Sequence, residues 1–225
     1  MNSAVSGITA LDKVHVFQWM ISRPIVTGTV SGLIMGDIAA GMLCGACIEL
    51  VWLGVLPIGN YTPPDAHAAA ACAGTAAAIW HAGSAYGPSS FALLAVLCCI
   101  PAGILSKSGD FKMRKEMSKK AEEFLSGTPP YDLRGLGFMV CLGMFLKTGL
   151  QVLAVGVIAI AIDPLVNNFL SQDKFRHGLE LSASFLPALG MVQLARCIGA
   201  RGRERYVGAG AVVTLMVYIY FGAIR

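Results

Sequence analysis

A single charged side chain inside a long apolar stretch constrains this chain most. Between Ile38 and Gly59, Glu49 is the only residue that is charged at neutral pH. A charge at membrane depth costs about a few kcal/mol, so such a group is usually paired or faces a cavity. The stretch also contains Gly54 and Pro57, and irregular backbone persists inside a bilayer only where it lines a cavity or is buried in protein. These features predict a polar pocket for a small solute.

The composition places the chain in a membrane. Of its 225 residues, 56% are hydrophobic and 13% are charged, whereas roughly 25% are charged in a typical soluble domain. A spanning helix needs about 20 residues to cross ~30 Å of hydrocarbon. We therefore expect an all-α integral membrane protein with several transmembrane helices in a single domain, 1–225. Residues 1–16 have neither a basic start nor an apolar core, so insertion is expected to rely on internal helices.

The region 17–80 is expected to contain short, closely packed helices and a re-entrant or broken-helix hairpin near 38–65. Glycines recur at four-residue spacing in two sets, Gly28, Gly32 and Gly36, and then Gly41 and Gly45. This spacing favours close packing between helices. Asp37 and Asp65 each precede an apolar segment, where a helix N-cap would lie. Capping and ligand binding are compatible roles for Asp65.

The second half alternates apolar spans with basic segments. An apolar helix is expected over 91–105, followed by an amphipathic cytoplasmic connector over 106–134 that suits a membrane surface. In the next apolar run, 135–162, Lys147 and Gln151 share one helical face and so point to an interior or to water. Pro164 is expected to end that helix, and a polar loop then leads to spans at 181–198 and 207–224.

The cysteines do not indicate a metal site. Cys44 and Cys47 have the spacing of half a zinc site, but both lie in an apolar run without a second matching pair, and buried free cysteine behaves as a small hydrophobe. No phosphate-binding GxxxxGK[ST] loop occurs, so ATP hydrolysis by this chain is not expected. We expect no catalytic residue, metal, cofactor or nucleic-acid partner.

Several short motifs together resemble one family of membrane proteins. They are FQ at 17–18, RP at 23–24, GxxxGxxxGD at 28–37, GxxxE at 45–49 and PPD at 63–65. In this order they resemble the sugar-channel subunit IIC of the mannose/fructose/sorbose family of the bacterial phosphotransferase system. The family usually has a further apolar segment before the FQ motif, whereas residues 1–16 precede it in this sequence.

The resemblance implies a multi-pass protein of the bacterial cytoplasmic membrane that binds and translocates a sugar. It implies a sister membrane subunit, IID, cytoplasmic IIA and IIB proteins, and a trimeric assembly. In that family a phosphohistidine on IIB donates the phosphoryl group to the sugar. This chain would then be a non-phosphorylated component, without a phosphoryl-carrying residue of its own.

The candidate sugar ligands lie in the organising stretch. Carboxylates and amides bind sugar hydroxyls, and this chemistry is offered by Gln18, Glu49, Asn60, Asp65 and His67. His67, which stands beside alanines, also fits a satisfied interior histidine. The alternative for Glu49 is a structural ion pair with Arg23 or Lys147.

Two other functions are compatible with parts of the sequence. An ion-coupled secondary transporter could use Glu49 and Asp65 as a coupled pair in a broken-helix site. A scaffold without transport activity would leave Glu49 without a purpose. The coupled transporter would move its solute alone on an ion gradient, whereas a phosphotransferase component would need its partners and phosphoenolpyruvate.

The basic segments predict the topology. Positive residues favour the cytoplasmic side, so we expect Lys115 and Arg203 to lie inside and Lys174 to lie outside. Substituted-cysteine labelling in a background without the seven native cysteines would test this. Labelling of Lys115→Cys and Lys174→Cys from the same side would overturn it.

Overall fold

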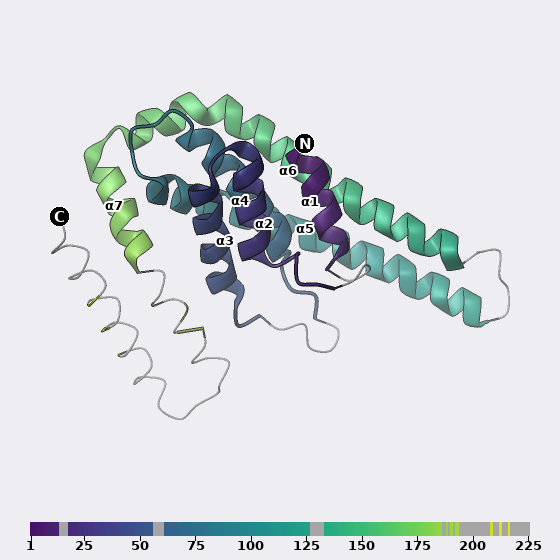
Figure 1. Cartoon of the computed structure of the whole chain (residues 1–225). Helices are drawn as coiled ribbons and strands as arrows, with labels where there is room; N and C mark the ends of the chain where they lie inside the picture. The colour runs from purple at the N-terminus through teal and green to yellow at the C-terminus, as the bar shows by residue number, and fades with distance from the viewer. Residues whose placement is uncertain are drawn as a thin grey trace.

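The computed structural model describes residues 1–13, 18–55, 61–126 and 133–185, with isolated positions beyond 185. Within these residues the chain forms helices and no strand, which confirms the all-α expectation. The helices in chain order (Figure 1) are α1 Asn2–Leu11, α2 Pro24–Met35, α3 Ile38–Trp52, α4 Ala66–His81, α5 Pro88–Leu125, α6 Leu133–Leu170 and α7 Asp173–Ser184.

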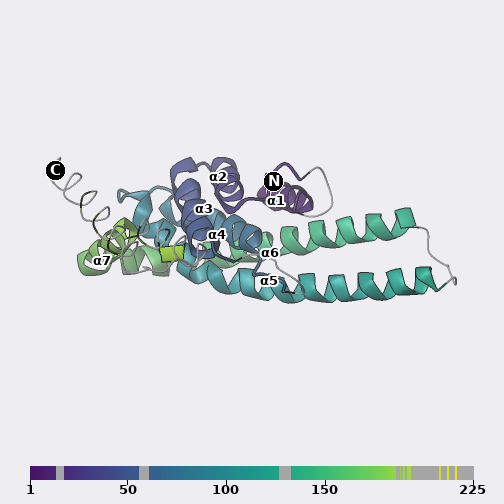
Figure 2. The ribbon, with the colours of Figure 1, turned by 90° about the horizontal axis from the view of Figure 1, so that it is seen from below.

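Two long helices, α5 and α6, frame the structure. Each has 38 residues, and the segments Pro88–Glu123 and Gly137–Leu170 are long and apolar enough to cross a membrane. A helix of this length reaches about 57 Å at 1.5 Å per residue, well beyond the ~30 Å hydrocarbon core. The two helices continue side by side past the other helices as an arm (Figures 1 and 2).

Three helices, α2, α3 and α4, are short, and α3 lies in the stretch 38–65 where a re-entrant or broken helix was expected. They have 12, 15 and 16 residues, so each reaches only about 18–24 Å and is too short to span the bilayer. Pro24 opens α2, and Gly36 ends it with φ +93°, a conformation that favours glycine. Asp37 then caps α3 by accepting the Ala40 N–H at 3.0 Å, as the sequence predicted. The expected break after α3 falls partly on residues 56–60, which lie outside the described residues.

Glycines allow α2 and α3 to pack with their backbones in contact. A Cβ atom on Gly28 would lie 2.7 Å from the carbonyl oxygen of Gly41 and 2.8 Å from Cα of Gly45. Gly74 of α4 approaches the same surface, since its Cβ would lie 2.8 Å from the Gly28 carbonyl oxygen. The predicted role in helix packing is confirmed for Gly28, Gly32, Gly41 and Gly45, whereas a Cβ on Gly36 would have no neighbour within 4 Å and this glycine ends α2 instead.

Helix α4 forms the centre of the domain. Almost all of its residues are buried, and most of them are alanines, which let α2, α3, α5 and α6 approach closely. At its C-terminal end, Trp80 donates its indole N–H to the Ala159 carbonyl of α6 at 3.0 Å. His81 contacts the Asp37 carboxylate through Nδ1, and its Nε2 lies 2.9 Å from the Tyr86 carbonyl oxygen. These contacts fix one end of α4, and the candidate site lies at the other.

The long helices correct two predictions. Residues 106–125 do not form a separate surface helix but continue α5 without a break. Pro164 does not end α6, which runs on to Leu170, because a membrane helix tolerates proline where neighbouring groups satisfy the freed carbonyl. The polar loop predicted after Pro164 is therefore mostly helical, in the end of α6 and in α7. The spans predicted at 181–198 and 207–224 lie largely outside the described residues.

Helix α1 was not predicted. The sequence analysis assigned no helix to residues 1–16, but residues 2–11 form a helix that packs on α6. Glycines again permit the contact, because a Cβ on Gly7 would lie 2.7 Å from the Phe145 ring and one on Gly149 would lie 3.1 Å from the Ser3 carbonyl oxygen. Its position brings the segment after α1 against the N-terminus of α4.

The α2–α3 packing predicts the effect of Gly28→Ala. Alanine favours a helix over glycine by about 1 kcal/mol, but the new methyl group would meet backbone atoms of α3, and overpacking costs about 1–3 kcal/mol. We expect a melting temperature a few degrees lower. The control is Gly87→Ala, because a Cβ at Gly87 has no neighbour within 4 Å. Equal melting temperatures for Gly28→Ala and the wild type would contradict the packing.

Candidate functional site

Asp65 is a buried carboxylate at the N-terminus of α4. It is only 2% exposed, and its Oδ1 accepts the Ala68 N–H at 3.3 Å, which confirms the predicted N-cap. Its Oδ2 accepts the hydroxyl of Ser106 at 2.7 Å, and its own N–H donates to the Gly103 carbonyl at 3.0 Å. Asp65 therefore ties the start of α4 to α5.

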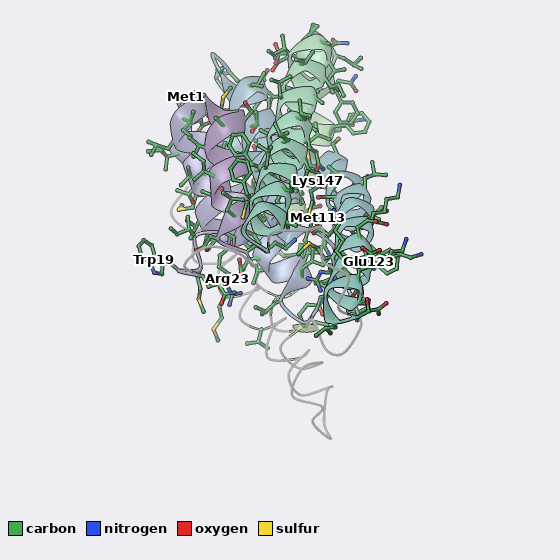
Figure 3. All side chains as sticks on the ribbon, turned by 90° about the vertical axis from the view of Figure 1, so that its right-hand side faces the viewer. Met1, Trp19, Arg23, Met113, Glu123 and Lys147 are labelled. Carbon is green, nitrogen blue, oxygen red and sulfur yellow. The ribbon has the colours of Figure 1, made fainter. Side chains whose placement is uncertain are left out.

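Two lysines and a second aspartate complete a charge cluster around Asp65. The ammonium of Lys13 lies 3.1 Å from Oδ1 of Asp65, and that of Lys147 lies 3.3 Å from Oδ2. Asp110 of α5 pairs with the same two lysines, at 2.8 Å from Lys13 and in close contact with Lys147. These four residues, the charge cluster, join the segment after α1 to α4, α5 and α6. Figure 3 shows Lys147 where α5 and α6 face each other.

The charge cluster is electrically balanced, and this balance makes its burial possible. A buried ion pair is tolerated only when good geometry and further hydrogen bonds offset the loss of hydration. Burial lowers the pKa of Lys13, but the carboxylates of Asp65 and Asp110 outweigh burial and raise this pKa above its ordinary value. Lys13 is therefore charged at neutral pH, and removal of any one member leaves an uncompensated charge.

Within the described residues, His67 has a buried ring nitrogen without a hydrogen-bond partner. The ring is 3% exposed, and its Nε2 lies 2.9 Å from the hydroxyl of Thr9. When that hydroxyl donates its single hydrogen to the Ser6 carbonyl, 3.1 Å away, Nε2 carries the ring hydrogen and Nδ1 is a bare acceptor; when it donates to Nε2, Nδ1 carries the hydrogen. In both cases Nδ1 has no hydrogen-bond partner within the described residues. A buried polar nitrogen normally has such a partner.

Glu49 takes part in a separate ion pair. Its Oε1 lies 2.9 Å from Nη1 of Arg23, and its Oε2 accepts the Ile25 N–H at 3.4 Å. Both contacts lie at the N-terminus of α2, where free N–H groups and the helix dipole favour an anion. Of the two cations considered as structural partners of Glu49, the structure places Arg23 beside it, while Lys147 binds Asp65 and Asp110.

The residues predicted to bind sugar do not all lie in one site. Asp65 and His67 lie together at the start of α4, and Glu49 lies with Arg23. Gln18 is exposed in the segment between α1 and α2, with φ +54°. Asn60 lies outside the described residues.

Sequence reasoning missed Lys13, Ser106 and Asp110. The sequence did predict that Lys147 and Gln151 share an inward face of α6, and this prediction is confirmed. Lys147 reaches the charge cluster, and Gln151 donates to the Ala102 carbonyl at 2.7 Å. Asp110 was overlooked because it stands in a block of basic residues that suggested a solvated surface. No pattern in the sequence pairs a residue of 1–16 with α4.

Four of the described cysteines are buried as small apolar groups, namely Cys44, Cys47, Cys72 and Cys99. Cys44 and Cys47 are free and buried in α3, and the Sγ of Cys44 lies 3.6 Å from the Ala92 carbonyl oxygen. Among the described residues, no group of three or more His, Cys, Asp or Glu side chains could hold a metal ion.

Comparison with known families decides the classification. The family model described as "PTS system sorbose-specific iic component" matches residues 3–223. The chain belongs to this family of IIC membrane components. The resemblance of its motifs between Phe17 and Asp65 is confirmed, and the apolar helices α5 and α6 fit a membrane protein.

Curated relatives carry the same component name. The chain is 24% identical to the sorbose-specific EIIC component of Klebsiella pneumoniae over 186 residues, which are 82% of this chain and 67% of the relative. It is 42% identical over 61 residues to the putative N-acetylgalactosamine permease IIC component 2 of Escherichia coli K12, which are 27% of this chain and 45% of that relative. The second match thus spans less than half of that relative's length.

A solved structure shares the fold. The protein titled "Structure of membrane protein" superposes with a TM-score of 0.63, at 15% sequence identity, over 98% of this chain and 92% of that chain. At this identity the likeness concerns the fold of the IIC chain alone.

The charge cluster predicts strong coupling between Asp110 and Lys147. Either Asp110→Asn or Lys147→Met strands a buried charge, and breaking a buried pair costs about 3–5 kcal/mol. The double variant removes one charge of each sign, so we expect it to be less destabilised than the sum of the single variants. The exposed pair Glu116 and Lys119, at 3.4 Å, is the control, because such pairs contribute about 1 kcal/mol or less. If the destabilisation of the double variant equals the sum for the two single variants, Asp110 and Lys147 do not balance each other's charge.

Proposed function

We propose that this IIC chain is the sugar-binding and sugar-translocating membrane subunit of a mannose-family, phosphoenolpyruvate-dependent phosphotransferase system. It would span the bacterial cytoplasmic membrane several times and import a sugar for phosphorylation by IIB. The observation that carries the proposal is the family match over residues 3–223. A buried polar site at the centre of an otherwise apolar helical domain supports it.

The sugar is proposed to bind through Gln18, Glu49, Asn60, Asp65 and His67. The position of Asp65 and His67 supports this assignment most directly, because Nδ1 of His67 is a buried nitrogen without a partner among the described residues, and a sugar hydroxyl can either donate to it or accept from it. Asp65 already receives four donors, from Ala68, Ser106, Lys13 and Lys147. A carboxylate offers about four lone-pair sites, so a sugar hydroxyl at Asp65 would replace one of these donors. Sugar binding would thereby loosen one helix from the charge cluster.

The partners are proposed from the family. IID would complete the membrane part, in a trimeric assembly, and IIA and IIB would pass the phosphoryl group from the cytoplasm. The IIC chain itself would bind the sugar and expose it to IIB. Glu49 and Asp65, the coupled pair of the alternative transporter, are bound to different cations, and the family match supports the phosphotransferase component instead.

Transport by the isolated chain tests the proposal. Liposomes that contain only this chain should show at most slow downhill leakage of sugar. Addition of IID, together with IIA and IIB that already carry the phosphoryl group, should give accumulation of sugar phosphate. Uphill uptake by the chain alone on a proton or sodium gradient would overturn the proposal in favour of a secondary transporter.

The role of Glu49 is tested by Glu49→Gln with Arg23→Gln as the matched control. As a ligand, Glu49 would lose a charge-assisted hydrogen bond worth about 1.5–3 kcal/mol, so sugar affinity in the assembled complex should fall by about one to two decades. Arg23→Gln breaks the same ion pair but should leave affinity nearly unchanged. Arg23 is about half exposed, so either change should have only a small effect on stability. Equal affinity losses in the two variants would mean that the pair acts structurally.

A further inference from the structure

We propose that the groove between α5 and α6 in the arm binds an anionic phospholipid. A hollow of about 430 Å³ lies between these helices, beside Lys13 and Asp110 at its inner end. A second hollow of about 320 Å³ shares Met113, Met117 and Val140 with it, so the two form one groove. Figure 3 shows Met113 between the two ribbons.

The floor of the groove is apolar and suits a hydrocarbon chain. Met113 and Met117 line it from α5, and Val140 and Met144 line it from α6. Gly143 makes room on α6, since a Cβ there would lie 3.2 Å from the terminal methyl group of Met113. Methionine side chains are flexible and adapt to a chain of variable shape.

The rim of the groove is positively charged and suits a phosphate group. Four cationic side chains and two carboxylates line the two hollows, namely Lys13, Lys112, Arg114 and Lys120 against Asp110 and Glu116. Lys13 and Asp110 neutralise each other within the charge cluster. Arg114 makes no ion pair with any described carboxylate. A guanidinium group can form bidentate hydrogen bonds with phosphate oxygens.

The position of the groove along the helices matches the headgroup level. Helix α5 is apolar up to Leu105, and its charged residues begin at Lys107. Arg114 follows Lys107 by about 10 Å of helix, within reach of the interfacial layer. On the facing helix, Phe138 and Met139 are 69% and 66% exposed and require an apolar environment. Basic pockets between membrane helices on the cytoplasmic side are typical sites for anionic headgroups.

The lining favours a lipid over other occupants. A small hydrophilic anion would use the cations but leave the methionine floor in water. An anionic lipid satisfies both parts at once.

The test is titration of the purified full chain in neutral detergent with phosphatidylglycerol, with thermal unfolding as the readout. Phosphatidylglycerol should raise the melting temperature of the wild type more than phosphatidylcholine with the same chains. In Arg114→Gln, the affinity for phosphatidylglycerol obtained from this titration should fall by about tenfold or more, because a hydrogen bond to a charged group is worth about 1.5–3 kcal/mol. Lys115→Gln is the control, since it makes the same charge change at an exposed neighbour that does not line the groove.

Other outcomes would overturn the proposal. If Lys115→Gln weakens lipid binding as much as Arg114→Gln, the lipid responds to overall positive charge and not to the groove. If phosphatidylcholine raises the melting temperature as much as phosphatidylglycerol, the headgroup is not recognised. A similar rise with inorganic phosphate would indicate a free anion as the ligand, and no rise at all would leave the groove without a lipid. If Arg114→Gln is itself unstable, Met117→Gln tests the floor in the same titration and should weaken the response as well.

Discussion

The carboxylate of Asp65 is the contact on which the rest of the structure depends. Four donors converge on it, from the backbone of α4, from Ser106 of α5, from Lys147 of α6 and from Lys13 after α1. Charges buried in an apolar domain are stable only when they are paired and hydrogen-bonded. The two lysines in turn require Asp110 as a second anion. Four chain segments are therefore held together by one balanced set of charges.

Small residues let the short helices α2, α3 and α4 pack closely beside the charge cluster. The alanines of α4 and the glycines of α2 and α3 bring backbones into contact, and the chain thereby packs five helices around a segment of only 16 residues. Contacts between small residues leave few bulky side chains to lock the arrangement. The charge cluster at one end of α4 and the contacts of His81 at the other supply directional bonds there. An exchange of donors at Asp65 would then change how α4 is held without disturbing its apolar packing.

Local patterns in the sequence predicted the local features. The N-caps at Asp37 and Asp65, the glycine contacts of α2 and α3 and the inward face of α6 each follow from spacing within one segment. The charge cluster could not be predicted in the same way, because Lys13, Asp65, Asp110 and Lys147 are far apart in sequence and are brought together only by the packing of α1, α4, α5 and α6. Charge counting also misjudged the segment after Leu105, since a basic stretch can extend a spanning helix as well as lie on a membrane. For Pro164, tertiary context outweighed the local preference against proline in a helix.

The most direct test is an experimental structure of the assembled complex in lipid nanodiscs with its sugar bound. The account predicts sugar density within hydrogen-bonding distance of Nδ1 of His67 and of the Asp65 carboxylate. It also predicts that one of the four donors seen here at Asp65 has moved away. Sugar bound apart from both residues, with the charge cluster unchanged, would contradict it.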